Sequence, residues 1–324
     1  MRAVGLFSGG LDSILAVKLM QEQGIEVIGV AFTSPFFVNS EEKKGWLRDV
    51  AEKEGFELRF MELRDDYFDM VKKPKHGHGK NMNPCIDCHA FMLRKAKELM
   101  DSEGAGFIFT GEVLDERPMS QRKKALGVVE EEAGLKGKLL RPLSAKLLEE
   151  TEAEKKGLVD REKLLDIKGR GRKRQIELAR KLGVKDYETP AGGCILTNKE
   201  YSEKLKDLFR NNKDIKKEDV VLLKTGRHFR VGDTKIIVGK DEKDNEKLER
   251  TKHDLILEAK DFVGPVTIVK GRVDDKIIEI AASLTARYCD ADQRKVKIIY
   301  GKKAFDKDII VKNMDDAKIE KIRI

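Results

Sequence analysis

The hydrophobic and polar positions of residues 1–133 alternate between two periods. Short apolar runs typical of buried strands are separated by longer stretches in which apolar residues recur every three or four positions, as on one face of a helix. The predicted strands cover residues 2–7, 25–32, 56–61 and 106–110, and the predicted helices cover residues 11–23, 40–54, 87–103 and 120–133. This alternation predicts an α/β fold, a parallel sheet with helices on both faces.

The pattern changes in the last third of the chain. The apolar runs become short and β-rich, at residues 220–223, 235–238, 266–269, 296–300 and 309–311, with one long helix predicted over 274–288. This predicts a smaller α+β domain. A chain of 324 residues exceeds the usual size of a single core. We therefore predict a first domain at residues 1–215 and a second at 217–324.

Three loops of the first domain are expected to converge, because ligands of parallel sheets bind at the carboxyl ends of strands. They are residues 8–13, 31–35 and 110–121. The first reads Ser-Gly-Gly-Leu-Asp-Ser and joins a predicted strand to a predicted helix. Its glycines let main-chain N–H groups approach phosphate, and the helix N-terminus adds partial positive charge. Asp12 suits such a cradle only when a divalent cation separates it from phosphate.

The segment 8–13 resembles the Ser-Gly-Gly-x-Asp-Ser signature of the PP-loop ATP pyrophosphatases, which have an adenine nucleotide α-hydrolase-like fold. The alternative is a strand–turn–helix with incidental glycines. The resemblance implies that ATP is split between its α- and β-phosphates and that Asp12 acts in catalysis through Mg²⁺. The residues expected to bind ATP are Ser8, Gly9, Gly10, Leu11, Asp12, Ser13, Ala31, Phe32 and Gly111.

A second group of candidate residues is thiols. The segment 83–88, Asn-Pro-Cys-Ile-Asp-Cys, leads into a predicted helix, where thiols have a lowered pKa and serve as nucleophiles or ligands. Cys194 lies in a glycine-containing loop. Three thiolates can hold an iron–sulfur cluster with one open position, whereas a closed zinc site needs a fourth ligand such as His76, His78 or His89. A cluster, a persulfide–disulfide cysteine pair and structural zinc all remain open.

With Thr110-Gly111-Glu112, these motifs resemble the tRNA thiouridine synthetases over residues 1–210. Their cluster-free branch typically has Asp at the position of Cys85, so this chain is similar to the cluster-dependent branch. The resemblance implies that ATP adenylates a uridine carbonyl of tRNA and that sulfur then displaces AMP. Cys85 and Cys194 would act in catalysis, and Cys85, Cys88 and Cys194 would hold a [4Fe-4S] cluster. Sulfide or a cysteine-desulfurase-derived persulfide would supply the sulfur.

The basic charge is compatible with a nucleic-acid partner. The formal net charge is +8, of which residues 201–324 carry +6 and residues 1–200 carry +2. Residues 217–324 resemble the RNA-binding domain of NFACT proteins in Thr234–Lys240 and the polar and helical segments after it, with an oligomerisation or structural domain as the alternative. The candidate RNA contacts, which a solvated surface explains as well, are Arg170, Arg172, Lys173, Arg174, Arg227 and Arg230.

Composition favours a cytoplasmic protein. No apolar run approaches the ~20 residues of a membrane span, the N-terminus runs straight into a predicted strand, and a Cys-x-x-Cys pair among four cysteines favours a reducing compartment. Two other functions remain: a PP-loop enzyme acting on a small carboxylate or amide, and a non-catalytic RNA-binding protein with structural zinc. The modified uridine, 2-thio or 4-thio chemistry and the oligomeric state stay open.

Overall fold

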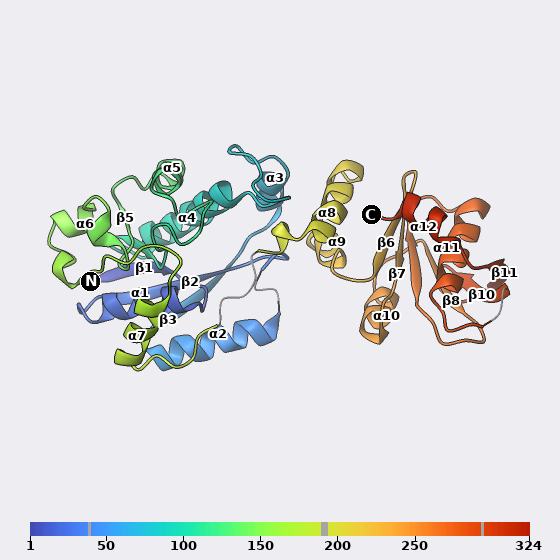
Figure 1. Ribbon diagram of the computed structural model, residues 1–324, viewed down its shortest axis with the longest axis horizontal. Coiled ribbons are helices and arrows are strands. Elements are labelled where there is room, and N and C mark those ends of the chain that lie inside the picture. The colour runs from blue at the N-terminus through green and yellow to red at the C-terminus, as the bar shows by residue number, and fades with distance from the viewer. Residues whose placement is uncertain (38–39, 189–193, 293–294) are drawn as a thin grey trace. The chain divides into compact units, whose positions relative to one another are not determined.

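The computed structural model describes residues 1–37, 40–188, 194–292 and 295–324 (Figure 1). Internal contacts divide the chain into two units, Met1–Asn198 and Lys199–Ile324, called here the N-terminal and C-terminal units. Within the described ranges, no helix is long and apolar enough to cross a membrane.

The N-terminal unit is built on a parallel sheet of five strands in the order β3-β2-β1-β4-β5. The strands are β1 (Arg2–Leu6), β2 (Glu26–Thr33), β3 (Glu57–Glu62), β4 (Ile108–Thr110) and β5 (Leu139–Leu140). The four predicted strands are confirmed, and β5 is too short to show a pattern. Because Leu6 of β1 lies opposite both Val30 and Thr110, the loops after β1, β2 and β4 start side by side at one edge of the sheet.

Helices cover both faces of this sheet, so the predicted α/β fold is confirmed. Figure 1 shows α1, α2 and α7 on one face and α3, α4 and α5 on the other. Their bounds are α1 (Leu11–Gln21), α2 (Glu41–Glu54), α3 (Asp65–Lys72), α4 (Cys85–Ser102), α5 (Lys123–Ala133), α6 (Glu152–Lys155) and α7 (Lys173–Lys181). Three short 3₁₀ turns are Ala145–Leu147, Arg161–Lys163 and Ile195–Thr197. Helix α1 is buried on almost every side, which explains its nearly continuous apolar sequence.

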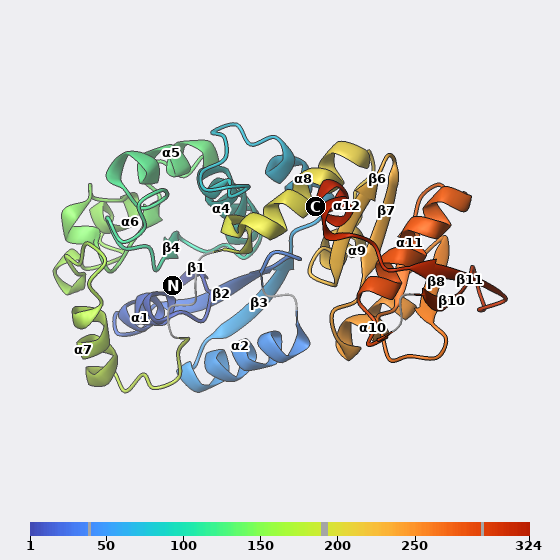
Figure 2. The ribbon, with the colours of Figure 1, turned by 45° about the vertical axis from the view of Figure 1, so that its right-hand side comes forward.

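The C-terminal unit contains an antiparallel sheet of six strands in the order β11-β10-β8-β9-β7-β6 (Figure 2). The strands are β6 (Arg227–Val231), β7 (Thr234–Val238), β8 (Leu255–Ala259), β9 (Thr267–Lys270), β10 (Lys295–Gly301) and β11 (Lys307–Lys312). The helices are α8 (Lys199–Asn211), α9 (Lys217–Leu222), α10 (Glu242–Glu249), α11 (Asp275–Arg287) and α12 (Asp316–Ile322). The predicted smaller α+β domain is confirmed.

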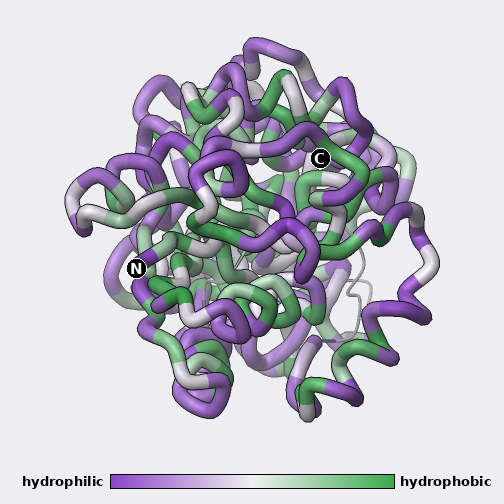
Figure 3. The backbone as a smooth tube through the Cα atoms, turned by 90° about the vertical axis from the view of Figure 1, so that its left-hand side faces the viewer, coloured by the Kyte–Doolittle hydropathy of each residue, from purple (hydrophilic) through white to green (hydrophobic). Residues whose placement is uncertain are grey.

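Both faces of this second sheet bury apolar side chains, because neighbouring strand residues point to opposite faces. Ile236 and Val238 pack in one cluster with α11, while Ile237 packs in another with Leu222 of α9 and Leu248 of α10. Figure 3 colours the backbone of the chain by hydropathy, and hydrophilic residues predominate on the outer turns of the trace.

One expectation for this part of the chain is wrong. Residues 220–223 lie in and just after helix α9 rather than in a strand: Asp219 caps the helix by accepting the Lys216 N–H (3.3 Å), and only Val221 of the apolar run is exposed. The predicted domain bounds of 1–215 and 217–324 stay a prediction, while internal contacts place the division between the units before α8. The reason is tertiary: Asp207 of α8 forms an ion pair with Arg230 of β6 (2.6 Å), and Lys204 donates to the Gly226 carbonyl (3.1 Å).

Candidate functional site

The loop between β1 and α1 forms a compact turn. The Ser13 hydroxyl donates to the Gly10 carbonyl (2.8 Å) and accepts the Ser8 N–H (3.3 Å). Gly9 has φ +76°, and a Cβ there would lie 2.4 Å from the Trp46 ring, so this position requires glycine. The N-cap residue of α1 is Gly10, so no N-cap side chain occupies the N–H groups at the start of this helix. The first turn of α1 therefore presents N–H groups suited to an anion.

Gly111 brings the loop after β4 against this turn. A Cβ at Gly111 would lie 2.5 Å from both the carbonyl carbon and the oxygen of Asp12, so only glycine permits the approach. Ala31 and Phe32 lie inside β2, which continues to Thr33, and both side chains are buried. The structure thus places the predicted ATP residues at one edge of the sheet, and their contacts with nucleotide stay a prediction.

Asp12 lies among charged groups that sequence reasoning did not connect to it. Arg172, just before α7, has its Nη2 3.8 Å from Asp12 Oδ2. Burial raises the pKa of Asp12, opposed in part by Arg172, Gln175 and Arg117. Burial and the Asp12 charge likewise raise the pKa of Glu116. Two carboxylates beside one another suit a divalent cation.

Neither Glu116 nor Gln175 was predicted from the sequence. Glu116 lies in the loop 110–121, which was expected to converge with residues 8–13, but no signal singled this residue out. Gln175 follows Arg172 by one helical turn, and both come more than 150 positions after residues 8–13, so only the packing of α7 against α1 brings them to Asp12.

The three candidate thiols are brought into one neighbourhood by a contact between distant segments. Met82 N–H donates to the Leu196 carbonyl (3.1 Å), and the Asn81 amide donates to the Thr197 carbonyl (2.7 Å). This docks the Ile195–Thr197 turn on the loop before α4. Cys194 and Cys85 consequently lie close enough to Cys88 for their charges to raise its pKa.

The surroundings of Cys88 keep its thiol neutral. Cys88 Sγ is hydrogen-bonded to the Tyr67 hydroxyl (3.0 Å), and Cys85 Sγ accepts a long bond from the Asn83 amide (3.6 Å). Burial raises the pKa of Cys88 to about 12, although the Tyr67 hydroxyl opposes the shift. The lowered pKa expected from the helix N-terminus is therefore wrong for Cys88, because desolvation of the thiolate outweighs the helix dipole.

The histidines suggested as a fourth zinc ligand have other partners. His76 lies 3.2 Å from Glu132, His78 Nε2 lies 2.8 Å from the Val71 carbonyl, and His89 Nδ1 lies 2.8 Å from Glu112. In the described part of the chain, no three His, Cys, Asp or Glu side chains form a group arranged to hold a metal ion. The three thiols are therefore near one another without forming a metal site in this arrangement, and their ligation of a cluster stays a prediction.

Glu112 connects the thiols with the nucleotide loop. The Glu112 carboxylate is buried between two side chains. Its Oε1 is hydrogen-bonded to His89, and its Oε2 accepts a hydrogen bond from Arg141 Nε at 3.0 Å. Burial opposes ionisation, but Arg141 and His89 lower the pKa of Glu112 to about 2. Glu112 adjoins Gly111, which contacts Asp12, so one short segment joins the first turns of α1 and α4.

The candidate RNA contacts fall into two groups. Arg170, Lys173 and Arg174 are exposed, whereas Arg172 turns toward Asp12. In the C-terminal unit, Arg230 is paired with Asp207. The Arg227 guanidinium donates to the Gly239 carbonyl (2.8 Å) and lies 4.4 Å from the Tyr288 ring. Arg227 and Arg230 thus have structural partners.

His228, in the same strand as Arg227 and Arg230, is 1% exposed and bonds to the Thr225 carbonyl (2.8 Å). Its side chain therefore points into the unit and is not available to a partner at the surface.

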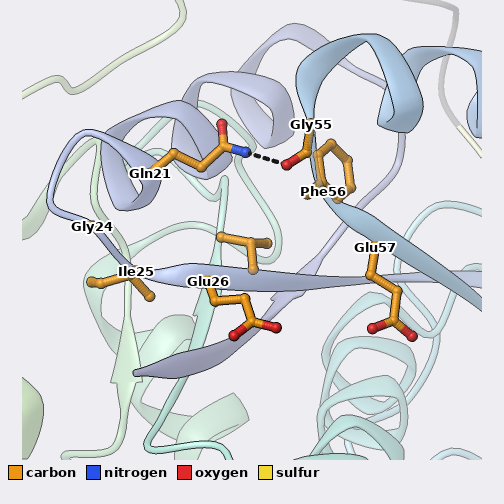
Figure 4. A pocket seen from close by; sticks show the side chains of 8 residues that line it. Gln21, Gly24, Ile25, Glu26, Gly55, Phe56 and Glu57 are labelled. Carbon is orange, nitrogen blue, oxygen red and sulfur yellow. Dashed lines mark hydrogen bonds between the residues drawn. The ribbon is translucent and has the colours of Figure 1, made fainter.

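A surface hollow of the N-terminal unit lies away from these residues. Gln21, Gly24, Ile25, Glu26, Gly55, Phe56 and Glu57 surround it, and the Gln21 amide donates to the Gly55 carbonyl at 3.0 Å (Figure 4). These residues lie at the amino ends of β2 and β3, opposite the edge that carries residues 8–13. The hollow is therefore not part of the candidate site.

Comparison with known proteins gives matches for both units. Residues 1–153 match the family model of the thiamine biosynthesis protein (ThiI), and residues 226–323 match that of the NFACT protein RNA binding domain. A tRNA-specific 2-thiouridylase, MnmA 1, of Caldanaerobacter subterraneus is 31% identical over 144 residues, covering 39% of this chain and 38% of that protein. A probable tRNA sulfurtransferase of Methanosarcina mazei is 31% identical over 127 residues, covering 35% and 28%. The chain thus spans about a third of the length of these curated relatives.

Two solved structures are similar. A 4-thiouridine synthetase–RNA complex with bound ATP has a TM-score of 0.42 and 20% identity, covering 68% of this chain and 53% of that chain. The U34-tRNA thiolase NcsA from Methanococcus maripaludis with its [4Fe-4S] cluster has a TM-score of 0.36 and 18% identity, covering 69% and 72%. By these matches, residues 1–153 are similar to the thiamine biosynthesis protein (ThiI) family and residues 226–323 are similar to the NFACT RNA-binding domain.

Proposed function

We propose that the chain is an ATP-dependent tRNA sulfurtransferase. The observation that carries the proposal is the continuity of the two candidate sites. Gly111 contacts Asp12 in the nucleotide loop, and its neighbour Glu112 pairs with His89, next to Cys88. An activated uridine at this edge of the sheet would therefore meet both the nucleotide and the thiols.

The reaction has two displacement steps. A uridine carbonyl oxygen attacks the α-phosphorus of ATP, and pyrophosphate leaves. Sulfur then attacks the carbonyl carbon, the carbon–oxygen bond breaks, and the oxygen departs with AMP. Asp12 would hold Mg²⁺, with Glu116 beside it, and the N–H groups of α1 would stabilise charge on the phosphates.

The thiols would deliver the sulfur. Three thiolates, those of Cys85, Cys88 and Cys194, would hold a [4Fe-4S] cluster. What supports this is their proximity, since Cys85 and Cys194 raise the pKa of Cys88, although the side chains would have to move to form a metal site. A cluster held in this way would offer an iron without a protein ligand, to which sulfide from a donor can bind. We propose sulfide as that donor. A desulfurase-derived persulfide would instead pass its outer sulfur to one cysteine of the chain, and after this sulfur has attacked the uridine carbon, a second cysteine would release the thiouridine by forming a disulfide with the first. We propose the C-terminal unit as the part that holds tRNA.

The test measures pyrophosphate and thionucleosides from purified protein, ATP, Mg²⁺, tRNA and sulfide. Asp12→Ala should lower pyrophosphate release at least ~10²-fold, because it removes a main electrostatic stabiliser of the transition state. Asp101→Ala, an exposed carboxylate at the end of α4, is the matched control. ADP and phosphate as products would contradict the proposal. Pyrophosphate release stimulated by a small metabolite without tRNA would favour the small-acceptor alternative.

A further inference from the structure

The first turn of α7 places unpaired polar groups against the nucleotide loop. Gln175 is completely buried, and its amide lies close enough to the Asp12 carboxylate to lower the pKa of Asp12, but neither amide atom makes a hydrogen bond of ordinary geometry. Arg172 Nε and Asp12 Oδ1 are also buried without partners. Buried polar atoms are normally hydrogen-bonded, so several unpaired ones in one place indicate a ligand that completes them.

The charges around these groups fit a phosphate bound with a metal. The 3.8 Å between Arg172 Nη2 and Asp12 Oδ2 is too long for a hydrogen bond, so the two ions lie near each other without a direct hydrogen bond. The carboxylate can bind a cation and the guanidinium can bind the oxygens of a phosphate held by that cation. The planar guanidinium matches phosphate through two parallel N–H groups.

A second helix terminus strengthens the arrangement. Arg172 occupies the position just before α7, and no side chain caps that helix. Because α7 packs on α1, the partial positive charges of two helix N-termini lie in one neighbourhood.

We propose that Arg172 and Gln175 bind the β- and γ-phosphates of ATP and hold the pyrophosphate that leaves. The inference deepens the proposed function and rests on it. It also distinguishes Arg172 from its basic neighbours: Arg170 and Lys173 are exposed, and Arg174 is exposed but paired with Asp166 (2.6 Å).

Equilibrium binding of Mg·ATP, Mg·pyrophosphate and AMP to the full chain tests the assignment. Arg172→Ala should weaken ATP and pyrophosphate binding about tenfold or more, with AMP and tRNA binding changed by less than about twofold. Arg172→Lys should restore part of the loss, because it keeps the charge and loses the two-pronged geometry. Lys173→Ala, its exposed neighbour, is the matched control and should leave pyrophosphate binding unchanged.

Gln175→Leu separates binding from folding. Removal of unpaired buried polar atoms should leave the thermal midpoint unchanged or raised, while pyrophosphate binding weakens. A lower midpoint with unchanged pyrophosphate binding would overturn the role of Gln175. If Arg172→Ala weakens tRNA binding and leaves pyrophosphate binding unchanged, Arg172 contacts RNA and the assignment to ATP is wrong. Failure of the unmodified chain to bind ATP would instead overturn the proposed function itself.

Discussion

The thiol of Cys88 is held in its neutral form by its surroundings. The first turn of α4 favours a thiolate, yet burial raises the pKa of Cys88 to about 12, and the Tyr67 hydroxyl opposes that shift only in part. At neutral pH, Cys88 is therefore a poor nucleophile by itself. Thiols that ligate a metal must be deprotonated, so a metal cation in the place of the proton would stabilise the thiolate charge that burial disfavours.

Iron content tests this reading of the thiols. Anaerobically isolated protein should contain about four irons per chain, and Ala at Cys85, Cys88 or Cys194 should remove them. Cys289→Ala is the matched control, since Cys289 lies in the C-terminal unit and its thiol donates to the Ala286 carbonyl (3.1 Å). Iron and sulfide analysis measures the outcome. Stoichiometric zinc in active protein would contradict the cluster, and active protein without metal would favour a persulfide.

Elements of the N-terminal unit meet through glycine where backbones approach each other. The loop after β4 touches the first turn of α1 at Gly111, whereas Gly127 in the middle of α5 has no atom within 4 Å of an added Cβ. The two glycines therefore have opposite roles. Gly111 permits a contact on which the site depends, and Gly127 only weakens its helix.

Alanine at these two positions should have opposite effects on stability. Gly111→Ala places a methyl group 2.5 Å from the Asp12 backbone. It should cost roughly 1–3 kcal/mol of unfolding free energy and weaken ATP binding. Gly127→Ala should raise stability by about 0.5–1 kcal/mol without changing ATP binding. Denaturant unfolding and nucleotide titration measure both, and normal ATP affinity in Gly111→Ala would show that the contact does not matter.

At the scale of the whole molecule, the basic side chains of the C-terminal unit differ in whether they have partners inside that unit. Arg227, Arg230 and Lys235 have partners inside the C-terminal unit, and burial lowers the pKa of Lys235 to about 8. Residues 295–312 contain six lysines and two aspartates. Lys297 pairs with Asp308 (3.2 Å), whereas Lys302 and Lys303 are exposed between β10 and β11. Strand β11 is an edge strand with Ile310 63% exposed. We expect this hairpin to contact RNA.

Charge reversal on the hairpin tests that expectation in the full chain. Lys302→Glu with Lys303→Glu should weaken tRNA binding several-fold at low salt and flatten its salt dependence, because fewer phosphate counterions are released (roughly one per contact). Lys276→Glu with Lys318→Glu makes the same charge change on α11 and α12 and is the matched control. Equal losses in both double variants would indicate a general charge effect rather than a surface at the hairpin.

The sequence by itself determined what depends on neighbours along the chain. The periodicity predicted the first four strands and the helices between them, because each buries a regular set of its own residues. The loop at residues 8–13 and the thiols at 85 and 88 were visible for the same reason: each motif is continuous. Strand β6 was missed, because Arg227 and Arg230 interrupt its apolar pattern while pairing elsewhere in the fold.

Tertiary structure decided what depends on contacts between distant segments. Packing of α7 on α1 turned Arg172 from a candidate RNA contact into a neighbour of Asp12. Docking of the Ile195–Thr197 turn brought Cys194 near Cys88. Burial raised the pKa of a thiol that its helix position alone would lower. Desolvation and charge pairing depend on distances in space, so the pattern of neighbouring residues along the sequence cannot predict them.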